Sequence, residues 1–151
     1  MAESTTITKH ITDEETTMIQ ARRKDQLQID IKAGQHELLS DVATSLGGTD
    51  AGPSPHEILE AALGACTSMT LQMYAARKKW DLTSCDTEVK FVREDKERVV
   101  LERIIHLRGN LDEMQRQRLF EIAEKCPIHE VLTRGAEVQS KLLPANEKGA
   151  K

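Results

Sequence analysis

The segment Pro55–Lys79 constrains this chain more than any other, because it carries the longest helical signal in the sequence. Ser54 is a suitable N-cap, a proline at the first helical position is tolerated, and Glu57 stands three residues after the cap, which completes a capping box. Within Ile58–Ala76 the residues are apolar or small on nearly every side of the helix, a pattern typical of a helix that is buried all round. A chain of 151 residues can hardly wrap such a helix alone, so we predict a homodimer in which a second copy covers part of it.

Length and composition favour a single domain. A chain of 151 residues with 38% hydrophobic residues can close one core, so we expect one domain over residues 1–143 and a polar, disordered tail over residues 144–151. A net charge of −4 lacks the basic surplus that nucleic acid binding requires, and 3% aromatic content offers no platform for stacking bases. No apolar signal region opens the sequence, and no stretch approaches the ~18 apolar residues of a membrane span. We therefore expect a cytoplasmic protein with neither nucleic acid nor membrane as a partner.

The rest of the chain shows mostly strand signals with short connections. Alternating or Thr- and Ile-rich stretches predict strands over Thr5–Thr12, Thr16–Ala21, Gln26–Lys32, His36–Val42, Leu82–Arg93, Arg98–Leu107 and Ala136–Leu142. Helical spacing predicts a helix from Leu111 to about Lys125, capped by Asn110, and a short one over Pro127–Thr133, ended by Gly135. A loop rich in glycine and proline, Ser45–Pro55, precedes the long helix. Because the strands come in runs, we predict an α+β fold with antiparallel sheets around the long central helix.

Three cysteines are too few, and odd in number, for the disulfide framework of a small secreted domain. Cys66 lies about three turns into the long helix beside Gly64 and Ala65, where a partner can approach the sulfur; the alternative is a buried thiol that packs as a small hydrophobe. Cys126 precedes a proline and occupies the N-cap position of the short helix, where backbone N–H groups and the helix dipole stabilise a thiolate. The alternative there is a cysteine that only closes a corner between two helices. Cys85 lies on the apolar face of a strand and is interpreted as a core residue.

Metal binding is a competing use of these side chains. Cys126 and His129 form one C-x-x-H pair, and His56 precedes Cys66 by ten residues, but no second such pair completes a tetrahedral set. We therefore expect neither a metal nor a cofactor. Glu57 is explained as the capping-box carboxylate, and no Ser-His-Asp or phosphate-loop pattern is present.

Two blocks of the sequence are similar to a known family. The first is Gly47–Thr67, GGTDAGPSPHEILEAALGACT, followed by Met73–Trp80, MYAARKKW; the second is Leu111–His129, LDEMQRQRLFEIAEKCPIH, continuing to Val138. They resemble the OsmC/Ohr family of osmotically inducible and organic-hydroperoxide-resistance proteins, and most of all its branch of OsmC-like redox proteins. The resemblance covers about Leu38–Leu142, while the strands before it match only loosely.

The resemblance implies an OsmC-like α+β fold of two intertwined subunits with two active sites at the dimer interface. It also implies that Cys66 is the peroxidatic cysteine and Cys126 the resolving one in a thiol-dependent peroxidase for organic hydroperoxides, alkyl or lipid. A dithiol reductant, lipoyl-type in some family members, would restore both thiols. The family supplies an arginine from its N-terminal strand region to the thiolate, and Arg22 or Arg23 is the corresponding candidate here.

One position departs from the family pattern. Family peroxidases commonly carry a glutamate ten residues before the peroxidatic cysteine, where this chain has His56, while Glu57 matches the second, less chemical position. A neutral histidine cannot balance an arginine as a carboxylate does. Two further interpretations therefore stay open: a dimeric binding module for a small hydrophobic ligand, and a redox sensor that uses the same disulfide without turnover.

Overall fold

The computed structural model describes residues 18–145, which excludes the strand predicted over Thr5–Thr12. The chain divides into two compact units, Met1–Leu59 and Glu60–Lys151. The single domain expected over residues 1–143 stays a prediction.

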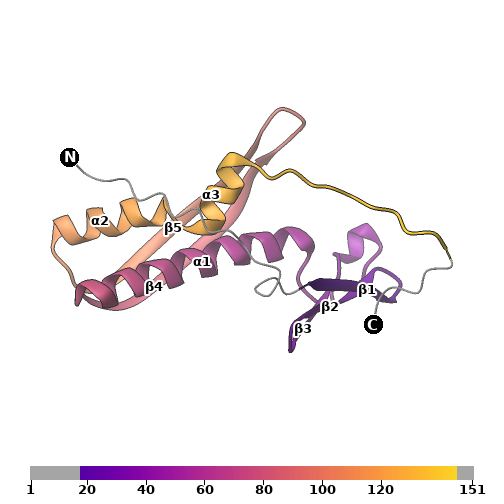
Figure 1. Ribbon diagram of the computed structural model, residues 1–151, viewed down its shortest axis with the longest axis horizontal. Coiled ribbons are helices and arrows are strands. Elements are labelled where there is room, and N and C mark those ends of the chain that lie inside the picture. Colours follow the sequence, from indigo (N-terminus) through magenta and orange to yellow (C-terminus); the bar gives the residue numbers. More distant parts are fainter. Residues whose placement is uncertain (1–17, 146–151) are drawn as a thin grey trace. The chain divides into compact units, whose positions relative to one another are not determined.

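The first unit contains a three-stranded antiparallel sheet in the order β1-β2-β3 (Figure 1). The strands are β1 (Ile19–Asp25), β2 (Gln28–Ala33) and β3 (His36–Ser40). Left-handed backbone forms both turns, with φ of 45° at Gln26 and 62° at Gly34. The strand expected to begin at Gln26 therefore starts two residues later, since Gln26 and Leu27 form the turn after β1.

The loop that follows β3, residues 41–53, is organised around one buried carboxylate, and we call it the Asp41 loop. Asp41 Oδ1 accepts the Val42 N–H at 2.8 Å, and Oδ2 accepts the N–H and hydroxyl of Thr49 at 3.0 and 2.6 Å and the Ala51 N–H at 3.2 Å. These donors, the Thr49 hydroxyl above all, lower the pKa of Asp41 to about 2 although burial opposes the charge. The loop closes so tightly that a Cβ at Gly48 would collide with the Val42 carbonyl.

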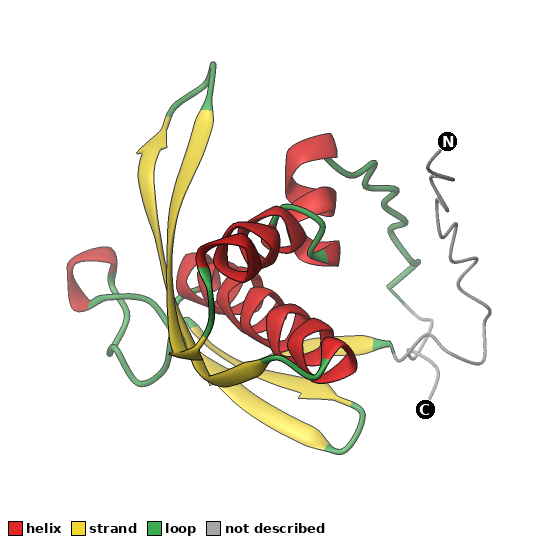
Figure 2. Cartoon of the chain, turned by 90° about the vertical axis from the view of Figure 1, so that its left-hand side faces the viewer, coloured by secondary structure: helices red, strands yellow, loops and turns green. Residues whose placement is uncertain are grey.

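The second unit packs helices against one side of a long hairpin (Figures 1 and 2). Its elements are α1 (Pro55–Lys78), which begins at the end of the first unit, β4 (Asp81–Glu94), β5 (Val99–Asn110), α2 (Glu113–Ala123) and α3 (Pro127–Arg134). β4 and β5 pair antiparallel along their length. The buried core joins α1, β4 and α2, with residues Leu71, Tyr74, Ala75, Cys85, Leu119, Ile122 and Ala123. The antiparallel α+β prediction is thus confirmed, with Cys85 in the core as expected.

The capping box of α1 is confirmed, because Ser54 N–H donates to Glu57 Oε2 at 2.7 Å and Glu57 N–H donates to Ser54 Oγ at 3.3 Å. The cap predicted for α2 is wrong. Asn110 pairs with Asp81 at the end of the hairpin, and Asp112 caps the helix in a capping box with Gln115.

In the single chain α1 buries only part of its circumference: Leu71 is fully buried, whereas Met69 and Met73 are 62% and 72% exposed. The second copy expected to cover the rest of this helix stays a prediction. The strand predicted over Ala136–Leu142 is absent, and its residues are exposed and form no sheet hydrogen bonds. A strand needs a paired neighbour, and none of the strands described within residues 18–145 pairs with this segment. Within the same residues, no helix is both long and apolar enough to cross a bilayer.

Candidate active site

Cys66 and Cys126 meet where α1 passes the junction of α2 and α3. Their thiols are hydrogen-bond partners although the residues are far apart in the sequence, and both cysteines are free. Cys66 is partly exposed, whereas Cys126 is fully buried. The pair therefore combines one thiol that a solute can reach with one that only Cys66 and the protein interior contact.

The position of Cys126 follows from the local sequence. α2 ends at Ala123, and the Cys126 N–H donates to the Ala123 carbonyl at 3.2 Å. Pro127 has no N–H and opens α3 as its first residue, so Cys126 becomes the N-cap of that helix, as predicted. The Cys126 carbonyl accepts the Glu130 N–H at 3.0 Å, which starts the helical hydrogen bonding.

The surroundings of the two thiols shift their pKa values in opposite directions. Burial opposes a charge on Cys126, but hydrogen bonds from Cys66, from the N–H groups of His129 and Ile128 and from the Thr67 hydroxyl lower its pKa overall. Burial raises the pKa of Cys66, and the hydrogen bond that it gives to Cys126 raises it further. The negative charge of the singly ionised pair therefore rests mainly on Cys126.

Sequence analysis missed the third component of this site, Arg103 of β5. Its side chain is 8% exposed, and its guanidinium donates to Thr67 Oγ1 at 3.0 Å, to the Ala123 carbonyl at 3.2 Å and to Glu124 Oε1 at 2.7 Å. The signal that could have found it is the apolar alternation of the strand, in which an arginine stands at a core-facing position. We call Cys66, Thr67, Arg103, Ala123 and Cys126 the thiol corner.

The small residues beside Cys66 serve packing against the hairpin. A Cβ at Gly64 would lie 3.5 Å from Val89 Cγ2 and 3.8 Å from the Thr87 carbonyl oxygen of β4. On the same face, the Ser68 and Thr87 hydroxyls are 2.8 Å apart. α1 therefore approaches β4 closely just before and after Cys66.

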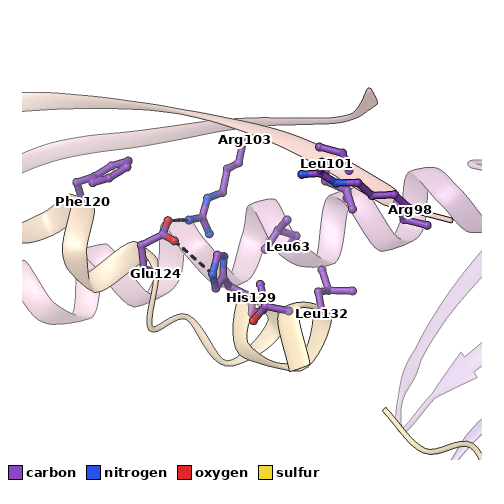
Figure 3. A pocket seen from close by; sticks show the side chains of 11 residues that line it. Leu63, Arg98, Leu101, Arg103, Phe120, Glu124, His129 and Leu132 are labelled. Carbon is purple, nitrogen blue, oxygen red and sulfur yellow. Dashed lines mark hydrogen bonds and ion pairs between the residues drawn. The ribbon is translucent and has the colours of Figure 1, made fainter. Parts of the chain in front are cut away.

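An open pocket of about 490 Å³ has Arg103 of the thiol corner in its lining (Figure 3). Its apolar lining comes from Leu63, Val99, Val100, Leu101, Phe120 and Leu132, and its polar lining from Arg98, Arg103, Glu124, His129 and Thr133. Glu124 bridges two of these groups, since its oxygens lie 2.7 Å from Arg103 Nη2 and 3.3 Å from His129 Nε2. The pocket thus offers an apolar wall with a charged end next to the corner.

The remaining predicted site residues lie in other surroundings. Arg22 and Arg23 are exposed and consecutive in β1, so their side chains point to opposite faces of the sheet. Arg23 Nε donates to the Gln26 carbonyl at 3.1 Å. His56 and Glu57 are exposed in the first turn of α1, and the hydrogen bonds of Ser54 lower the pKa of Glu57. Roles for all four in the chemistry of the thiols stay predictions.

Metal ligands do not gather at the site. Within residues 18–145, no three His, Cys, Asp or Glu side chains lie close enough together to hold a metal ion. Cys126 and His129, the predicted C-x-x-H pair, meet through the His129 N–H and the Cys126 sulfur.

The fold and the site define an α+β protein whose long helix carries one of two hydrogen-bonded thiols. The family model for OsmC-like proteins matches residues 48–141, and the chain belongs to that family. Both cysteines of the thiol corner lie within the matched segment. The curated proteins include no match.

Solved structures share this fold at low sequence identity. An OsmC-like protein from Mycoplasma pneumoniae is 16% identical, with a TM-score of 0.69 over 80% of this chain and 89% of the other. An organic hydroperoxide resistance protein OsmC from Legionella pneumophila is 21% identical, with a TM-score of 0.61 over 78% and 88%. The organic hydroperoxide resistance protein OhrB of Bacillus subtilis is also 21% identical, with a TM-score of 0.57 over 80% and 91%.

Proposed function

We propose that this protein is a thiol-dependent peroxidase that reduces organic hydroperoxides through Cys66 and Cys126. The observation that carries the proposal is the pair itself: a partly exposed thiol hydrogen-bonded to a buried one at a helix N-terminus. In the proposed reaction a peroxide reaches the first thiol, and the second thiol condenses with its oxidised form. The family relationship and the names of two structural neighbours agree with this assignment.

The proposed cycle balances at each step. The Cys66 sulfur attacks the distal oxygen of R–O–OH; an S–O bond forms, the O–O bond breaks, and the alkoxide takes a proton to leave as an alcohol. Cys66 is then a sulfenic acid. The Cys126 thiolate attacks that sulfur, and the hydroxide displaced leaves with a proton as water, which closes the disulfide. A dithiol reductant, of lipoyl type in some family members, restores both thiols and is itself oxidised to a disulfide.

Cys66 needs help to act as the nucleophile, since its pKa is raised within the single chain by burial and by Cys126. Two sources of help fit the proposal. Cys126 can take the Cys66 proton along their shared hydrogen bond, and an arginine of β1 can stabilise the resulting charge. We take Arg22 as the better candidate because Arg23 already donates to the Gln26 carbonyl. His56, in place of the usual glutamate, would leave that arginine without a carboxylate partner at this position.

The pocket beside the thiol corner supports an alkyl or lipid hydroperoxide as substrate. Its apolar wall, which includes Leu63, Leu101 and Leu132, suits a flexible hydrocarbon chain, and few aromatic side chains are available to select a planar ligand. The same lining supports a second function, that of a binding module for a small hydrophobic molecule. A co-purified ligand in native mass spectrometry, together with absence of peroxide turnover, would favour the second function.

We also propose that the active form is an intertwined homodimer. The exposed methionines of α1, Met69 and Met73, and the exposed Val138 and Leu142 form apolar surface that a second copy would cover. Light scattering at micromolar concentration should give the mass of a dimer. Met69→Lys with Met73→Lys should shift it toward a monomer, while Met114→Lys, at a position 80% exposed on α2, should not. A monomeric mass for the unaltered protein would refute the dimer.

Stopped-flow mixing with cumene hydroperoxide tests the peroxidase proposal. We expect loss of about one thiol pair per chain and a burst that is absent in Cys66→Ser. Cys85→Ser serves as the matched control, because Cys85 is buried in the core and should be silent. Equal peroxide loss in Cys66→Ser and in the unaltered protein would refute the assignment of a peroxidase that depends on Cys66. Disulfide formation without turnover, when a lipoyl dithiol is present, would instead identify a redox sensor.

A further inference from the structure

Arg103 is an unusual residue for the face of β5 on which it stands. Its side chain is only 8% exposed, although the side chain of its ion-pair partner Glu124 is 49% exposed. A buried cation is costly unless its N–H groups are satisfied. Arg103 meets this demand with three acceptors, and two of them, Thr67 Oγ1 and the Ala123 carbonyl, belong to the immediate surroundings of Cys126.

The hydrogen bond to Thr67 restricts what that hydroxyl can do. Thr67 is fully buried, and its single hydrogen can go to the Leu63 carbonyl at 2.8 Å or to the Cys126 sulfur. Arg103 cannot accept a hydrogen bond, so its contact with Thr67 always uses a lone pair of the oxygen and leaves the hydrogen for one of these acceptors. An N–H donor on the oxygen also polarises the O–H group and strengthens it as a donor.

The same nitrogen reaches Cys126 through the backbone. Arg103 Nη1 donates to the Ala123 carbonyl, which also accepts the Cys126 N–H. Arg103 is in turn held by Glu124, whose second oxygen pairs with His129 on α3 (Figure 3). One guanidinium therefore contacts both the side-chain partner of Cys126 and the carbonyl that fixes its backbone.

We propose that Arg103 is a positioning residue for Cys126, because its Nη1 holds both the Ala123 carbonyl that fixes the Cys126 backbone and Thr67 Oγ1. This contact polarises the Thr67 hydroxyl, which turns from the Leu63 carbonyl to the Cys126 sulfur when that sulfur is ionised. The catalytic meaning of this role rests on the function proposed above for Cys126. A resolving cysteine has to be ionised when Cys66 becomes a sulfenic acid, and burial works against that charge. The Thr67 hydroxyl, which is hydrogen-bonded to Arg103 of β5, offsets part of the free-energy cost that burial adds to a charge on Cys126.

The charged and titratable groups around Cys126 come from four elements. They are Cys66 on α1, Arg103 on β5, Glu124 at the end of α2 and His129 on α3. A test therefore has to remove Cys66 as a titrating neighbour and to separate the hydroxyl from the charge of Arg103.

The experiment measures thiolate absorbance at 240 nm against pH in a Cys66→Ser, Cys85→Ser background, where Cys126 is the remaining thiol. The spectrum of the same background with Cys126→Ser is subtracted, which removes the contribution of Tyr74. In this background Arg103→Gln and Thr67→Val should each reduce the ionisation constant of Cys126 by about tenfold, as expected for loss of a hydrogen bond to a charged group. Thr67→Ser keeps the hydroxyl and should restore most of that loss. Arg116→Gln is the matched control, since Arg116 also donates to a backbone carbonyl, that of Leu107, and should leave the constant unchanged.

The decisive comparison is Arg103→Gln measured with and without Thr67→Val. If Arg103 acts through the hydroxyl, most of its effect disappears in the Thr67→Val background. An equal effect in both backgrounds would overturn the proposal and leave Arg103 as a through-space charge, and no effect in either would leave it a packing residue. Where Arg103→Gln does not fold by circular dichroism, Arg103→Met, which also lacks the charge, takes its place under the same comparison. The titration is independent of peroxide, so a failed peroxidase assignment and a failed role for Arg103 remain distinguishable.

Discussion

The Asp41 loop and the thiol corner each bury an ionisable group, but they satisfy it in different ways. Asp41 receives four hydrogen-bond donors from residues within ten positions of itself, and no other acid competes for them. Cys126 draws its partners from α1, α3 and, through Arg103, β5, and one of them is the ionisable thiol of Cys66. A carboxylate surrounded by donors is a fixed charge that holds a loop together. A thiol pair has two coupled ionisable groups, and in the proposed cycle each sulfur in turn acts as a nucleophile.

The largest effect should come from removing one sulfur of the thiol corner. In Cys126→Ser the disulfide cannot close, so peroxide turnover with a dithiol should fall to the uncatalysed level. The Cys66 sulfenic acid should accumulate, and trapping it with dimedone for mass spectrometry checks this. Undiminished turnover would show that an external thiol reduces the Cys66 sulfenic acid. Cys126 would then have no catalytic role to set against the structural role of Asp41.

The next effect should come from Asp41→Asn. An asparagine presents one oxygen and an NH₂ group where the carboxylate accepts four donors, so some donors lose their acceptor. We expect the melting temperature to fall by several degrees and amide exchange at Thr49 and Ala51 to rise roughly tenfold. Asp50→Asn is the matched control, because Asp50 is exposed with φ of 55°, a conformation that asparagine adopts readily. Thiol titration should be unaffected by either change.

The two regions should also respond to pH in different windows. Since the pKa of Asp41 is lowered to about 2, its charge stabilises the fold above the unfolded-state pKa of about 3.9, and this contribution is lost as the pH falls toward 2. NMR shifts of the Thr49 and Ala51 amides should report that midpoint. In a Cys85→Ser variant, absorbance at 240 nm should show one thiol proton lost below the ordinary cysteine pKa and the other above it. A single step for two thiols would contradict the opposite shifts of their pKa values.

The smallest effect should come from replacing Cys85, which lies outside both the thiol corner and the Asp41 loop. Cys85 is 7% exposed in the core, and burial raises its pKa. Cys85→Ala should cost about 1 kcal/mol of unfolding free energy in urea and leave peroxide turnover unchanged. A large loss of turnover would mean that the thiol chemistry extends beyond the corner.

The helices and hairpins could be predicted to within a few residues because their signals are local. Ser54 and Glu57 fixed the start of α1, and Pro127 fixed both the start of α3 and the N-cap position of Cys126. The contact between Cys126 and Cys66 came only from the family resemblance, since no local pattern links residues so distant in sequence.

The sequence predictions that failed share a physical cause: the structure at these positions depends on partners that are distant in the sequence. Asn110 looks like a helix cap, but its pairing with Asp81 keeps it in the hairpin. The alternation over Ala136–Leu142 indicates a strand, yet no edge within residues 18–145 receives it. Arg103 breaks an apolar alternation, and the sequence does not say which acceptors make its burial tolerable.

Cys66 and Cys126 are sixty positions apart in the sequence, which has a consequence for the lifetime of the oxidised protein. A bond between them would tie the unfolded chain into a loop that contains β4, β5 and α2. Chain-entropy arguments for a loop of this length give about 4 kcal/mol of added resistance to unfolding. Peroxide would then do more than consume the thiols: it would leave the second unit tied against unfolding and proteolysis until a dithiol reopens the loop.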